Sequence, residues 1–62
     1  MTLEKFLAYE KVRQSGKTNM WDVLRVIKLT KGFLDREDCH DIMKHYSEYR
    51  VQWRSELEEA FK

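Results

Sequence analysis

Cys39, His40, Asp41 and His45 form the densest group of potential metal ligands in this sequence of 62 residues. Asp41 and His45 are four residues apart, a spacing that places two ligands on one face of a helix. Two ligands make an incomplete site, and Cys39 falls on the apolar side of that helix, where a thiol usually acts as a small core residue. We therefore expect no metal-binding residues, and a weak two-ligand site is the alternative.

Gly16-Lys17-Thr18 matches the end of a phosphate-binding loop. That loop needs another glycine five residues earlier, and position 11 is a lysine. Lys17, Thr18 and the free amides of the next predicted helix leave weak anion binding as an alternative. No serine, acid and histidine set can be assembled with confidence from this short chain. We predict that the protein is not an enzyme, has no catalytic residues and uses no cofactor.

The charge and apolar patterns exclude further classes of protein. Twelve Lys and Arg residues against 11 Asp and Glu give a net charge of +1, which provides no global attraction for nucleic acid. Every apolar stretch is interrupted by charge within a few residues, so no membrane span is expected. The single cysteine excludes an internal disulfide and fits a reducing, intracellular setting.

Two glycines and the absence of proline predict an all-α chain with breaks at Gly16 and Gly32. We predict a single helical domain, 1–62, with three helices at about 3–15, 20–30 and 36–61. Thr2, Asn19 and Asp35 are the predicted N-caps, the last in a capping box with Asp38. Apolar residues surround most of the second helix, which we expect to be the most buried of the three.

The third predicted helix is long compared with its neighbours: roughly 26 residues at about 1.5 Å each give a rod of about 39 Å. Its apolar stripe extends past anything that the shorter helices would cover. We predict that this stripe forms the interface of a helical-bundle homodimer or binds a partner protein. In the alternative, helix 3–15 folds along this tail within one monomer. The predicted interface residues are Tyr46, Tyr49, Trp53, Leu57 and Phe61.

Residues 20–46 also have the outline of a helix-turn-helix DNA-binding motif. The start of the would-be recognition helix is acidic, with carboxylates at Asp35, Glu37, Asp38 and Asp41, and these would repel phosphates. DNA binding would therefore need another face. The candidate nucleic-acid contacts are Lys11, Arg13, Lys17, Arg25, Lys28 and Lys31.

The run Tyr9-Glu10-Lys11-Val12-Arg13-Gln14-Ser15-Gly16-Lys17-Thr18-Asn19-Met20-Trp21-Asp22-Val23, followed by Ile42-Met43-Lys44-His45-Tyr46, resembles a family of short, uncharacterised proteins of phages and prophages of Gram-positive bacteria. The similarity covers roughly residues 5–50, and Ser-Gly-Lys-Thr-Asn-Met is its most distinctive part. The family supplies no activity. The resemblance implies a phage setting and hence the cytoplasm of a bacterial host.

Small phage proteins often act stoichiometrically by covering a surface of a host protein. By this analogy we predict a protein-interaction module that inhibits a host defence system, as anti-CRISPR proteins do. A basic groove of a host protein would meet either Asp35, Glu37, Asp38 and Asp41 or the terminal Glu56, Glu58 and Glu59. In the alternative, these acidic residues are helix-start and solvent charges. The alternative function is a helix-turn-helix DNA-binding regulator.

Overall fold

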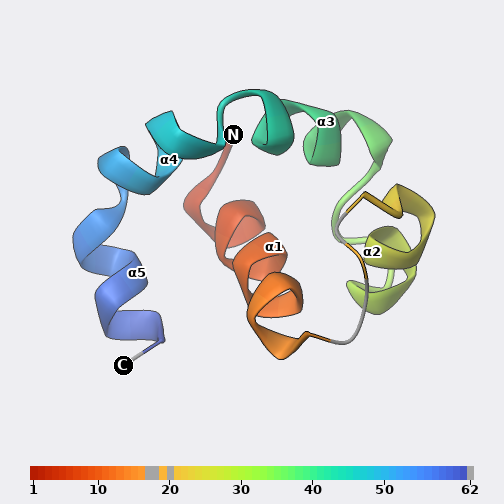
Figure 1. The fold of residues 1–62 in the computed structure, drawn as a ribbon, viewed down its shortest axis with the longest axis horizontal. Helices are drawn as coiled ribbons and strands as arrows, with labels where there is room; N and C mark the ends of the chain where they lie inside the picture. Colours follow the sequence, from red (N-terminus) through yellow and green to blue (C-terminus); the bar gives the residue numbers. More distant parts are fainter. Residues whose placement is uncertain (17–18, 20, 62) are drawn as a thin grey trace.

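A computed structural model describes residues 1–16, 19 and 21–61 of the chain, and all regular structure in these ranges is α-helical. Figure 1 shows α1 at the centre, with α2 on one side, α3 and α4 across its N-terminal end, and α5 on the other side. Helices α2 to α5 thus form an arch around α1. The helices are α1 Leu3–Ser15, α2 Val23–Leu29, α3 Arg36–Lys44, α4 Tyr46–Gln52 and α5 Arg54–Ala60.

The first helix begins and ends as the sequence predicts. The Thr2 hydroxyl oxygen accepts a hydrogen bond from the backbone N–H of Lys5 at 3.3 Å, which satisfies one of the free amides of the first turn. At the other end Gly16 has a φ of 66°, and its N–H bonds to the carbonyl of Arg13. A residue with a side chain is disfavoured in this left-handed conformation, so glycine fixes the end of the helix.

The second helix is shorter than predicted. Its N-cap is Asp22, whose carboxylate accepts from the N–H of Arg25, while the side-chain oxygen of Asn19 accepts from the N–H of Trp21. Asn19 therefore stabilises the turn before α2 and does not cap it. The predicted first residue, Met20, lies outside the described residues, as do Lys17 and Thr18.

The prediction that this helix is the most buried is wrong. Among its seven residues only Val26 is fully buried, and Leu24 is 64% exposed. An apolar circumference can be buried only where neighbours surround the helix. Because α2 is at one end of the arch, it has neighbours on one side, and Val23 and Ile27 pack there beside Val26.

The predicted continuous helix 36–61 is also wrong, because the chain bends at His45 and at Trp53. These residues have φ and ψ near −118° and 25°, and −113° and 30°. α-Helical hydrogen bonding resumes at each bend residue, from the N–H of Tyr49 to the His45 carbonyl at 3.0 Å and from that of Leu57 to the Trp53 carbonyl at 2.9 Å. The bends turn α4 and α5 back toward α1 (Figure 1).

This curvature covers the stripe that the sequence left exposed. The Phe6 ring of α1 is fully buried, and its centroid lies 5.9 Å from that of Tyr46, 5.7 Å from that of Tyr49 and 5.5 Å from that of Trp53. Leu57 is buried and Phe61 packs against the same core. The alternative of a tail folded along helix 3–15 within one monomer describes this arrangement. The uncovered rod, which was the physical argument for the homodimer, does not exist in the structure.

Candidate functional site

The potential metal ligands of α3 do not converge. Cys39 is fully buried in the core, where burial raises the pKa of its thiol, whereas His40 is exposed. Asp41 accepts a hydrogen bond from the Tyr49 hydroxyl at 2.8 Å, and His45 lies 3.2 Å from Glu48. Within the described ranges, no three His, Cys, Asp or Glu side chains are grouped so that they could hold a metal ion.

Three of the four predicted partner-facing acids have roles inside the fold. Asp35 and Asp38 form a reciprocal capping box at the start of α3, with bonds of 2.8 and 3.2 Å. Asp38 also pairs with Lys5 of α1 at 2.9 Å, and the hydrogen bond from Lys5 lowers the pKa of the Asp38 carboxyl. Asp41 holds Tyr49. Glu37 is exposed at the helix start.

A buried carboxylate that the sequence analysis did not single out lies at the centre of the arch. Glu10 is 2% exposed and accepts a hydrogen bond from the Tyr46 hydroxyl, which joins α1 to α4. Burial and this bond to Glu10 raise the pKa of Tyr46. The guanidinium groups of Arg13 and Arg50 lie 5.2 and 5.8 Å from the centre of the Tyr46 ring. Glu10 lies four residues after Phe6, so the two side chains are on the same apolar face of α1. This spacing is the sequence signal that could have indicated the burial of Glu10.

The predicted interface residues therefore take part in the internal packing of one molecule. Tyr46, Tyr49 and Trp53 surround Phe6, and Tyr49 and Trp53 also stack, with ring centroids 5.4 Å apart. Leu57 and Phe61 extend this packing along α5. These residues position the C-terminal helices around α1. Their assignment to an interface with a second molecule stays a prediction.

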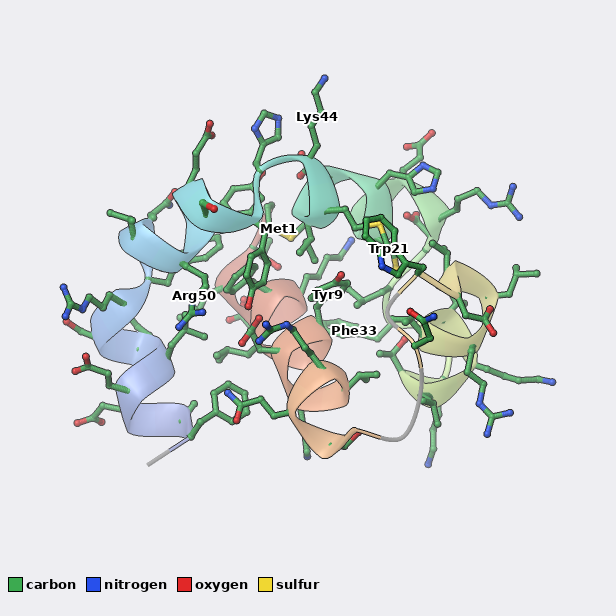
Figure 2. All side chains as sticks on the ribbon, in the orientation of Figure 1. Met1, Tyr9, Trp21, Phe33, Lys44 and Arg50 are labelled. Carbon is green, nitrogen blue, oxygen red and sulfur yellow. The ribbon has the colours of Figure 1, made fainter. Side chains whose placement is uncertain are left out.

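Several exposed apolar side chains lie in and beside α2, and others, such as Val51 of α4, lie apart from it. Trp21 is 82% exposed and Leu24 is 64% exposed. Arg25 and Lys28 lie with Leu24 on the outward side of the helix, because Lys28 is one helical turn from both Leu24 and Arg25. We call Trp21, Leu24, Arg25 and Lys28 the α2 surface. Figure 2 shows Trp21 beside α2 and α3, across α1 from Arg50.

A shallow cavity of about 310 Å³ adjoins this surface. Trp21 stands at its edge, and Met43 of α3 supplies an apolar wall. Tyr9, Arg13 and Tyr46 complete the lining. The cavity thus connects the exposed indole of Trp21 with the aromatic side chains at the centre of the arch, and among the described residues that line it Arg13 is the charged one.

The predicted nucleic-acid contacts are dispersed over two helices and a turn. Lys11 and Arg13 are exposed on α1, Arg25 and Lys28 on α2, and Lys31 in the turn that follows. Lys17 lies outside the described residues. Helix α3, which would be the recognition helix of a helix-turn-helix motif, begins with the acidic capping box and carries none of these cations.

No protein-family model, no curated protein and no solved structure matches this chain. None of the helices in the described part of the chain is both long and apolar enough to cross a bilayer.

Proposed function

We propose that this chain is a protein-interaction module that acts by stoichiometric binding through the α2 surface. The observation that carries the proposal is the exposure of Trp21 and Leu24 in a chain with a small apolar core. Exposed tryptophan is costly to leave in water and is enriched where protein interfaces are tightest. An apolar partner pocket that took both side chains would remove this surface from water.

The charges around these two residues define the partner's chemistry. Arg25 and Lys28 flank Leu24, and Lys31 follows the helix. A partner with an apolar pocket and acidic residues at its rim would complement this pattern, because rim charges of opposite sign favour encounter and fix the orientation. The acidic residues of α3 that could have met a basic groove are mostly occupied within the fold, which favours the α2 surface over them.

We further propose that the partner is a host defence protein, in keeping with the phage resemblance of residues 5–50. The test is phage infection of a bacterium that carries an active defence system, with and without expression of this chain. Plating efficiency is expected to rise with the unaltered protein and to fall back with Trp21→Glu. Val51→Glu is the matched control, since Val51 is 78% exposed on α4, away from the α2 surface. If both substitutions change plating efficiency equally, the α2 surface is not the binding site.

The second candidate function is nucleic-acid binding through the cations of α1 and α2. The exposed Trp21 beside Arg25 and Lys28 favours it, because an aromatic ring can stack on an unpaired base while cations contact phosphates. Fluorescence anisotropy with duplex and single-stranded DNA at low and high salt separates the candidates. A nucleic-acid-binding protein loses affinity steeply with salt, and a protein-interaction module binds neither probe.

A further inference from the structure

One side of α1 is only partly covered by the other helices. On the inner side Phe6, Tyr9, Glu10 and Val12 are buried. The helical repeat places Glu4, Leu7, Ala8 and Lys11 together on the other side; Glu4 and Lys11 are exposed, while Leu7 and Ala8 are half-buried and pack in part against the core. We call these four residues the α1 face. Its centre is apolar and its two ends carry opposite charges.

Two hollows run along this face. One, of about 560 Å³, lies between α1 and the end of α5, where Ala60 and Phe61 form its far wall beside Leu7 and Ala8. The other, of about 250 Å³, lies between α1 and the end of α2, where Leu29 faces Ala8. Figure 1 shows α5 and α2 on either side of α1. The α1 face is therefore a helix surface flanked by apolar recesses on both sides.

The order of residues on the α1 face is self-complementary. The midpoint between Leu7 and Ala8 is also the midpoint between positions 4 and 11. When two antiparallel helices are related by a two-fold axis that passes between them at this level, Glu4 of each lies opposite the partner's Lys11, and the Leu7 and Ala8 side chains of both copies meet around the axis. Both charge pairs form at once because the symmetry repeats each contact. The small Ala8 allows the two backbones to approach closely.

We propose that a second copy of this chain docks on the α1 face, with its own α1 antiparallel to the first. The charge order favours this occupant over a foreign helix, since Glu4 and Lys11 supply each other's counter-charge only in a symmetric pair. The Leu7 side chains of the two copies meet beside the recess between α1 and the end of α5. This dimer uses neither the α2 surface nor the residues that surround Phe6, so it is independent of the proposed function.

Charge reversal tests the pairing directly. Sedimentation equilibrium is expected to show a concentration-dependent dimer for the unaltered chain. Glu4→Lys and Lys11→Glu each place like charges opposite one another twice, and each is expected to weaken self-association by about tenfold or more. An equimolar mixture of the two variants restores association as a heterodimer, because every contact again joins opposite charges. The doubly reversed variant Glu4→Lys, Lys11→Glu restores it within one chain.

Glu56→Lys is the control, because Glu56 is exposed on α5 and does not line either hollow. Circular dichroism verifies that every variant keeps its helix content. The proposal is overturned if the unaltered chain is a monomer up to about 1 mM, if the single reversals dimerise as the unaltered chain does, or if neither the mixture nor the doubly reversed variant recovers association.

Discussion

Replacing Phe6 by alanine tests whether the aromatic packing around α1 holds the arch together. Phe6 is fully buried, and three aromatic rings from α4 and the following bend lie with their centroids within 5.9 Å of its own. The substitution removes the ring against which these side chains pack. If the C-terminal helices are held mainly by such contacts, their packing and the stability of the whole chain should fall together.

The expected magnitude is large for a chain of this size. Truncation of a buried phenylalanine to alanine costs about 3–5 kcal/mol, because transfer and cavity terms add. A chain of 62 residues at roughly 0.05–0.15 kcal/mol per residue has about 3–9 kcal/mol in total. Phe6→Ala is therefore expected to be largely unfolded in buffer or to unfold at very low urea. Val51→Ala, at an exposed position, is expected to change stability by less than about 0.5 kcal/mol.

The assay is urea unfolding followed by tryptophan fluorescence in a Trp21→Phe background, so that Trp53 is the only reporter. Trp53 stacks on Tyr49 beside Phe6, so its emission follows the packing under test. Near-ultraviolet circular dichroism gives a second measure of fixed aromatic packing. An unfolding midpoint for Phe6→Ala equal to that of Val51→Ala, with Trp53 emission unchanged, would refute the reasoning that α4 and α5 are anchored on α1 through Phe6.

Three further predictions concern stability. Tyr46→Phe removes the hydroxyl that bonds to the buried Glu10 carboxylate and is expected to cost about 1–3 kcal/mol. A double-mutant cycle with Glu10→Met, which removes the acceptor, should return a favourable coupling in urea, and additive effects would contradict the bond. The pKa of Asp38 is lowered mainly by its hydrogen bond to Lys5. The stability that the ionised Asp38 contributes is therefore complete above the unperturbed pKa of about 3.9 and is lost as pH falls through the lowered pKa. Between about pH 5 and pH 2 the melting temperature of Lys5→Met should fall less than that of the unaltered chain. Gly16→Ala is expected to cost about 1 kcal/mol in thermal unfolding because of the φ of 66°, since among the described residues beyond its chain neighbours no atom lies within 4 Å of the added carbon. An unchanged melting temperature would contradict the left-handed cap.

The features that the sequence predicts well are those fixed by local chemistry. Thr2 and Gly16 bound α1 where they were expected to, because a side-chain cap and a left-handed glycine depend on a few neighbouring atoms. The capping box of Asp35 and Asp38 is present for the same reason. Cys39, expected on the apolar side of its helix, lies in the buried core cluster.

The features that the sequence predicts poorly depend on contacts made across the whole chain. No residue between Arg36 and Phe61 forbids a helix, so the bends at His45 and Trp53 have no local signal. They follow from the burial gained when the stripe closes on Phe6, and periodicity alone cannot show whether a stripe faces a second molecule or its own first helix. The exposure of Leu24 is a similar case, since an apolar pattern around α2 does not reveal how many neighbours surround it.

The candidate site shows the same division. The sequence identifies the exposed cations by their residue types. It does not show which acidic side chains stay free for a partner, because long-range ion pairs such as that of Lys5 and Asp38 decide this. Glu10 was overlooked because a glutamate is usually solvated, and its partner Tyr46 lies 36 residues away. The α1 face could not be predicted from the sequence, because only the positions of α2 and α5 show which side of α1 they leave largely uncovered.

The position of Phe6 also has a consequence for biosynthesis. The rings that enclose it belong to residues 46–53, which the ribosome adds some forty residues later. At translation rates of about 5–20 residues per second, the nascent N-terminal helix waits roughly 2–9 s for its cover. We therefore expect α1 to lack its aromatic packing partners until residues 46–53 have been synthesised, and nonsense mutations before residue 46 to yield peptides that proteases clear.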